Sequence, residues 1–163
     1  LIPILKNNKY SEVQHGLASW CINFIGAAAA DTLKKAAKSK NNKVKSAAIS
    51  ALEGQIRAEK DPEAISLIED ALNTSNENVQ IEAIKIVGKL NTLNSYIPIL
   101  IKKLKSKSPE IRQTTVLALM QLNSKKALNP LKAILNIEQE LYVKEAIKLA
   151  INKISHSNNS IEN

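Results

Sequence analysis

The chain has 163 residues, of which 44% are hydrophobic and only 3% aromatic. Such a length can bury one sizeable core, and the scarcity of aromatic residues and glycine argues against a β-sandwich or barrel. The formal net charge of +8 suits a nucleic acid, an anionic membrane or an acidic protein as partner, but a lysine-rich solvated surface would carry the same charge. A single cysteine excludes a disulfide within the chain.

An internal repeat runs through most of the chain. Each copy opens with a β-branched residue that a polar residue follows. The openers are Val13, Val44, Val79, Ile111 and Val143. Small or apolar residues recur four, seven and eight positions after each opener, with Thr115 as the polar exception. These offsets lie on one face of an α-helix, so the pattern predicts five amphipathic helices, named the A helices.

Second helical stretches, named the B helices, are predicted between the A helices. Their expected ranges are Ala28–Lys38, Pro62–Leu72, Ser95–Leu104 and Lys126–Leu135, and Leu1–Lys6 looks like the end of an earlier one. Asp61 and Ser108 each precede a proline, which places a capping side chain before a proline at the first helical position. Pro98 and Pro130 stand early in their B helices, where a missing N–H costs little.

Residues 72–104 and 104–135 resemble the short HEAT repeat, including the subtype found in phycobilisome lyase subunits. The matching residues are Ser108, Pro109, Glu110, Ile111, Arg112, Ala118, Leu119, Leu122, Pro130 and Leu131. The resemblance covers residues 12–154 and is weakest in the first copy, where Gly16, Trp20 and Phe24 depart from the repeat. It implies an all-α fold, a right-handed α-solenoid of stacked antiparallel helix pairs of the HEAT-like or armadillo type.

We therefore expect residues 1–154 to form one domain of about four helix pairs with partial repeats at its ends. Residues 155–163 are polar and lack periodicity, so a disordered tail is expected there. The resemblance also implies that the A helices form the convex side and the B helices the concave side.

Residues with catalytic or metal-binding potential are few. His15 and His156 have no second His or Cys at metal-ligand spacing, and Cys21 lies on the apolar face of its helix, where a core thiol is expected. Trp20 and Phe24 are interpreted as core residues, with an aromatic docking patch as the alternative. We therefore expect no catalytic residue, no metal and no cofactor. Because no catalytic site is recognised, the chain is predicted not to be an enzyme. The resemblance to phycobilisome lyase subunits raises chromophore attachment, but nothing marks a bilin pocket and that activity is not expected.

The charge is unevenly distributed, with a net +6 in residues 1–57, −4 in residues 58–100 and +6 in residues 101–163. The sequence predicts a non-catalytic protein–protein interaction scaffold that binds a protein or peptide through its concave B-helix surface. The candidate contacts are Lys34, Lys35, Lys38, Glu63, Glu69, Lys102, Lys103 and Lys132.

The alternative function is nucleic-acid binding through the lysine patches. The acidic residues Glu63, Glu69 and Asp70 would interrupt a continuous track for the phosphates, and the scarcity of arginine weakens this alternative. No apolar run approaches the ~20 residues that span a bilayer, so a cytoplasmic location is expected. The chain begins at Leu1, which leaves a removed N-terminal signal open.

Overall fold

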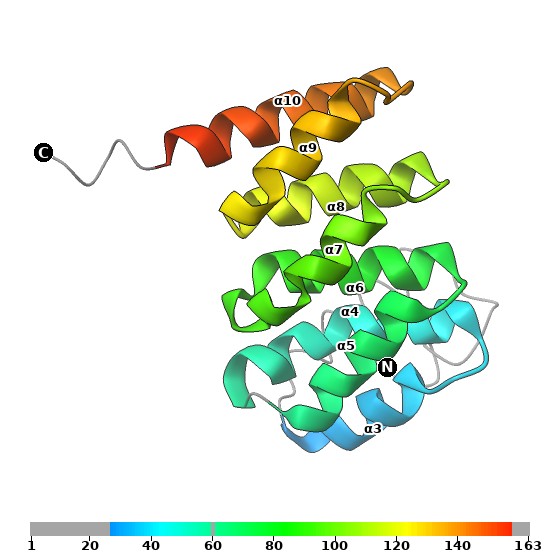
Figure 1. Cartoon of the computed structure of the whole chain (residues 1–163). Helices are drawn as coiled ribbons and strands as arrows, with labels where there is room; N and C mark the ends of the chain where they lie inside the picture. Colours follow the sequence, from blue (N-terminus) through cyan, green and yellow to red (C-terminus); the bar gives the residue numbers. More distant parts are fainter. Residues whose placement is uncertain (1–26, 60, 158–163) are drawn as a thin grey trace, which may run out of the picture. The chain divides into compact units, whose positions relative to one another are not determined.

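The computed structural model describes residues 27–59 and 61–157, and their regular structure is entirely helical. The helices are α3 (Ala27–Ala37), α4 (Asn42–Glu59), α5 (Pro62–Asn73), α6 (Glu77–Lys89), η1 (Asn91–Tyr96), α7 (Ile97–Lys103), α8 (Pro109–Gln121), η2 (Lys125–Ala127), α9 (Leu128–Leu135) and α10 (Leu141–His156). Figure 1 shows this succession of helices along the chain. The predicted all-α fold is confirmed.

The A helices correspond to α4, α6, α8 and α10, and each predicted opener is the third residue of its helix. In α4, α6 and α8 the backbone amide at this third position donates the capping hydrogen bond. The amide of Val79 donates to Asn76 Oδ1 at 3.1 Å, and the amide of Ile111 donates to Ser108 Oγ at 3.2 Å. Asn41 plays the same part at the start of α4. Because a capping side chain satisfies an amide that has no partner inside the helix, it fixes where α4, α6 and α8 begin, whereas α10 starts after Glu140 without a side-chain cap.

The predicted inner face of the A helices is the buried one. In α4, α6, α8 and α10, the residues at offsets zero, four, seven and eight are all buried except Ile151, which is half-buried. Thr115, the polar member of the set, is fully buried and donates its hydroxyl to the carbonyl of Ile111 at 2.7 Å. A buried hydroxyl is tolerated when it is hydrogen-bonded. The first copy of the repeat, which opens at Val13, lies outside the described residues.

The B helices differ in regularity. α3 and α5 match the predicted ranges to within one residue, whereas the third and fourth B helices each divide into a short 3-10 segment, η1 or η2, and a short α-helix, α7 or α9. Pro98 is the second residue of α7 and Pro130 the third of α9. A proline cannot donate a backbone hydrogen bond, so it is accommodated within the first turn of an α-helix. The α-helical part therefore starts close to the proline.

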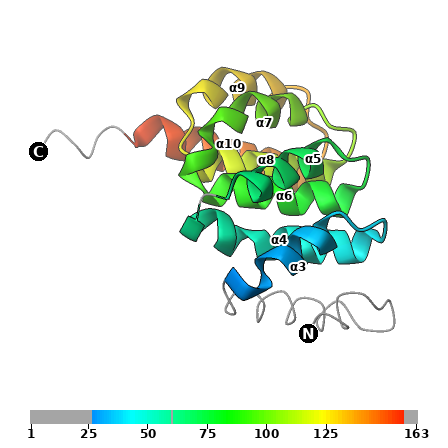
Figure 2. The same cartoon turned by 90° about the horizontal axis from the view of Figure 1, so that it is seen from below.

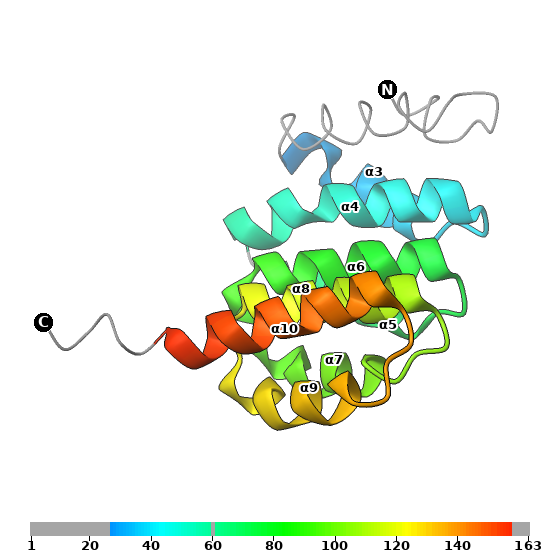
Figure 3. The same cartoon turned by 90° about the horizontal axis from the view of Figure 1, so that it is seen from above.

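Contacts between backbone positions that the fold brings together divide the chain into two compact units, residues 1–86 and residues 87–163. In the first, α3 packs against α4 and α5, and α4 packs against α5. In the second, α8 packs against α7 and α10, and α10 packs against α9. Figures 2 and 3 show α7 and α9 on one side of this second unit and α8 and α10 on the other. A single domain over residues 1–154 stays a prediction.

The last described helix extends beyond its expected end. α10 continues to His156, two residues into the segment expected to be a disordered tail from residue 155. Ile154 is fully buried near this end, and Nδ1 of the exposed His156 lies 2.8 Å from the carbonyl of Asn152. Because Ile154 is buried, it anchors the last turn of α10, and the helix continues two residues beyond the end predicted from the apolar pattern. None of the helices in the described part of the chain has the length and apolar character needed to cross a membrane.

Candidate protein-binding surfaces

Two of the predicted contact lysines are engaged inside their own unit. Lys34 Nζ on α3 lies 3.0 Å from Asp61 Oδ2 and 3.2 Å from Glu63 Oε2 at the start of α5. It also lies 3.5 Å from Asp31 Oδ1 on its own helix, and Lys38 Nζ lies 2.8 Å from Glu63 Oε1. These five side chains form an electrostatic latch between α3 and α5, the α3–α5 latch.

The pKa values follow from these contacts. The hydrogen bond with Asp61, and then that with Glu63, raise the pKa of Lys34 above its ordinary range. Lys34 lowers the pKa of Asp61, and Lys38 followed by Lys34 lowers that of Glu63. Asp61 also caps α5 by accepting two backbone amides of its first turn. Lys34 and Lys38 therefore each form an ion pair with Glu63. The side chain of Lys34 is only 15% exposed.

The other predicted contacts are distributed over both units. Lys35 and Glu69 are exposed in the first unit, and Lys102 and Lys132 are exposed in the second. Lys103 is half-buried, and burial lowers the pKa of its ammonium group. The structure thus brings Lys34, Lys38 and Glu63 together, and a role in partner binding stays a prediction for all eight residues.

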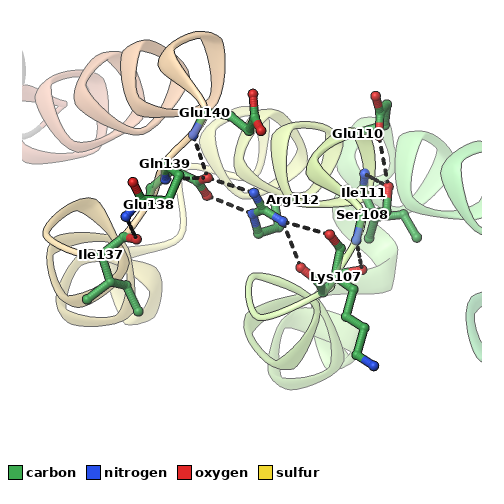
Figure 4. Close-up of polar contacts among 10 residues, drawn as sticks. Lys107, Ser108, Glu110, Ile111, Arg112, Ile137, Glu138, Gln139 and Glu140 are labelled. Carbon is green, nitrogen blue, oxygen red and sulfur yellow. Dashed lines mark hydrogen bonds and ion pairs between the residues drawn. The ribbon is translucent and has the colours of Figure 1, made fainter.

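A second charged cluster, in the second unit, went unrecognised in the sequence (Figure 4). Arg112 on α8 faces Glu138 in the turn before α10, with Nε 2.7 Å from Oε2 and Nη2 2.6 Å from Oε1. Nη1 of the same guanidinium donates to the carbonyls of Ser106 at 2.9 Å and Lys107 at 3.1 Å. One arginine therefore binds both the turn that precedes α8 and the turn that precedes α10, and we name Arg112 with Glu138 the Arg–Glu clamp.

The carboxylate of the clamp is almost completely buried, since the side chain of Glu138 is 3% exposed. Besides Arg112, it accepts the backbone amides of Gln139 at 3.0 Å and Glu140 at 3.1 Å. These donors, Arg112 first, lower the pKa of Glu138 to about 2. A buried charge with a forked partner and two amide donors is the arrangement that makes burial of an ion pair tolerable.

The polar residue after each opener was the signal for this clamp. Arg112 reaches the carbonyl six residues before it, and in the first unit the side-chain amide of Gln80 donates in the same way to the carbonyl of Thr74. In α6 and α8 the recurring polar position therefore ties the helix to the turn that precedes it. The partner carboxylate of Arg112 is 26 residues away in sequence, which no local pattern reveals.

Large apolar side chains are exposed in the second unit. Ile137 and Leu141 are 71% and 72% exposed, Leu149 is 56% exposed and Tyr142 is 41% exposed. All four lie on α10 or in the turn that leads into it. Exposed apolar side chains are typical of surfaces that bind other proteins where they form a contiguous patch.

The described ranges contain no group of three His, Cys, Asp or Glu side chains placed to hold a metal ion. His15, Trp20, Cys21 and Phe24, which the sequence singled out, lie outside them. His156 is exposed at the end of α10.

Pairs of helices that repeat along the chain are characteristic of the helical repeat proteins. A family of HEAT repeats matches residues 1–77 and 66–152, and the chain belongs to that family. Among curated relatives it resembles the bilin biosynthesis protein MpeU of Synechococcus sp. (strain WH8020), at 28% identity over 154 residues. The match covers 94% of this chain and 52% of MpeU, so the chain spans about half the length of this relative.

A solved structure shares the fold. It is the complex of CpcE and CpcF of phycocyanin lyase from Nostoc sp. PCC7120, with a TM-score of 0.76 and 20% identity over 91% of this chain and 96% of that chain. The predicted HEAT-like family and α-solenoid class are therefore confirmed.

The prediction that the chain is not an enzyme is wrong. The relatives are named for bilin biosynthesis and for a lyase, which overturns the non-catalytic interpretation. That prediction rested on the absence of a recognisable motif. In a repeat protein the functional groups lie on surfaces built from several helices, so a short local motif is not required.

Proposed function

We propose that this chain takes part in attaching a bilin chromophore to a protein, as a HEAT-repeat subunit that works with a protein partner. The observation that carries the proposal is the match to a bilin biosynthesis protein over 94% of the chain. This similarity extends through nearly all the repeats, whereas a match confined to one motif would cover only a site.

The described surfaces suit such a role. Attachment needs a bilin and an acceptor protein in one place, and holding two reactants in the productive arrangement can itself supply a large part of the rate. The exposed apolar side chains Leu141, Tyr142 and Leu149 offer contact area for a protein. The Arg–Glu clamp fixes the turns that precede α8 and α10, which keeps the neighbouring surface preorganised.

The test is an attachment assay in cells that supply a bilin and an acceptor apoprotein of the phycocyanin kind. The chain is co-expressed alone and together with a second HEAT-repeat lyase subunit, and cells without the chain are the control. We expect covalent bilin on the acceptor, seen as visible absorbance and fluorescence of its band on a denaturing gel and as added mass. No bilin above the control with any partner, from a chain that is folded by circular dichroism, would refute the proposal.

A further inference from the structure

The B-helix side of the second unit carries lysines and no acids. Residues 87–109 and 121–137, which contain η1, α7, η2 and α9, include no Asp or Glu. Five lysines there are exposed. Within the described ranges, the structure records no ion pair and no hydrogen bond made by the side chains of these lysines. They are Lys102, Lys105, Lys107, Lys126 and Lys132, and we name them the lysine face.

The first unit handles its lysines differently. There the α3–α5 latch neutralises Lys34 and Lys38 with Asp61 and Glu63 at the start of the next B helix. Residues 1–86 hold eleven Lys and Arg against ten Asp and Glu, whereas residues 87–163 hold twelve against five. Nearly all of the net positive charge of the chain therefore belongs to the second unit, where the B helices supply no internal counter-charge.

Helix electrostatics does not account for this arrangement. Lysines at the end of α7, such as Lys102, are favoured by the helix dipole. Lys125 and Lys126 stand at an N-terminal end, namely the start of the helical run formed by η2 and α9. A positive charge is disfavoured there. Lys125 Nζ donates to the carbonyl of Ile154 at 2.6 Å, which gives it a structural role, but Lys126 is exposed. Its charge serves no contact within the described fold.

We infer that the lysine face docks an acidic segment of a protein. The inference rests on the proposed function, in which the chain works on or with another protein, and it assigns the surface that receives that protein. α7 and α9 lie on the same side of the unit (Figures 1 and 2), so a single partner can reach lysines from both helices. Complementary charge of this kind accelerates encounter and selects the partner.

The composition of the surface favours carboxylates over phosphates. Residues 97–107 and 125–136 contain no arginine and no aromatic residue. Arginine provides the planar fork that suits phosphate groups, and aromatic side chains provide the platform on which single-stranded bases stack. The lysine ammonium group is a point charge on a flexible stem, so it can pair with carboxylates that are scattered over a protein surface.

The test measures binding directly, without bilin or acceptor, by the fluorescence anisotropy of two labelled probes. One probe is an oligoglutamate peptide and the other an oligothymidylate of equal charge. The lysine-face variant carries Lys102→Glu, Lys105→Glu and Lys132→Glu, which reverses the charge of three of the five lysines. The control Lys40→Glu, Lys43→Glu, Lys153→Glu changes the net charge equally at exposed lysines elsewhere.

We expect the full chain to bind oligoglutamate, with roughly tenfold or greater weakening in the lysine-face variant and about twofold or less in the control. Equal weakening in both variants would mean that only net charge matters and would overturn the assignment. So would absence of peptide binding, or tighter binding of oligothymidylate that the lysine-face variant abolishes. Because no lyase activity is measured, a failed attachment assay would leave this result standing and refute only the proposed function.

Discussion

Replacing Arg112 by methionine should destabilise the second unit by about 3 kcal/mol at neutral pH. Methionine keeps much of the length and apolar stem of arginine but removes the guanidinium. Glu138 then keeps a buried carboxylate with two backbone amides as its remaining donors, and the carbonyls of Ser106 and Lys107 lose their shared donor.

Two independent arguments give this magnitude. Removing one partner of a buried ion pair costs roughly 3–5 kcal/mol because the other charge stays buried. The shift of the Glu138 pKa from 4.5 to about 2 corresponds to ~3 kcal/mol of preferential stabilisation of the charged form. Arg112 is the first contributor to that shift but shares it with the backbone amides, so the lower end of the range is expected.

The dependence on pH provides a sharper signature. The folded-state pKa of Glu138 is depressed, so its contribution is present above the ordinary value of 4.5 and is lost as pH falls toward about 2. The difference in stability between the wild type and Arg112→Met should therefore be largest near neutral pH and shrink below pH 4.5. Urea unfolding followed by circular dichroism at several pH values measures both quantities.

A matched double variant separates the charge from the packing. Arg112→Met combined with Glu138→Gln removes both charges, so it should recover part of the stability that Arg112→Met alone loses. A loss below about 1 kcal/mol for Arg112→Met, or a difference that does not change with pH, would show that the Arg–Glu clamp does not work as described.

Three further predictions about the fold can be tested by thermal or urea unfolding. Asp61→Ala removes the cap of α5 and should cost ~1 kcal/mol, while Asp61→Asn, which keeps a capping oxygen, should cost less. Gly88→Ala should destabilise by ~1–3 kcal/mol despite the better helix propensity of alanine, because its Cβ would lie 2.7 Å from Ala118 Cα; a stabilised variant would contradict this packing. Leu119→Ala should cost ~2–5 kcal/mol, and Leu149→Ala, at an exposed position, should stay within ~0.5 kcal/mol; equal effects would mean that the assigned inner face is wrong.

The helices and their buried faces could be predicted because their determinants are local. An opener such as Val79 or Ile111 sits three residues after its capping side chain, and the inner face follows from helical geometry alone. The division of the third and fourth B helices was less accessible. Pro98 and Pro130 predicted the start of a helix, but a 3-10 turn in front of each depends on packing against neighbouring helices.

The charged contacts could not be predicted, because their partners are distant in sequence. Lys34 meets Asp61 27 residues away, and Arg112 meets Glu138 26 residues away. Both separations are slightly shorter than one repeat, so each pair joins one repeat to the next. A repeat-by-repeat comparison of charges could have suggested such pairs, but only the fold shows that Lys34 and Lys38 are taken up by the latch while Lys102 and Lys132 are left exposed.

This difference between the two units also explains why the chemistry escaped the sequence. A catalytic motif is visible in sequence when one segment places its groups close together, as in a loop or a helix start. Here the surfaces that we propose for partner binding, the lysine face and the apolar side chains of α10, come from helices and turns spread over residues 97–149. The proposed function, attaching a chromophore to another protein, also depends on that protein, so the residues of this chain describe only one side of the interaction.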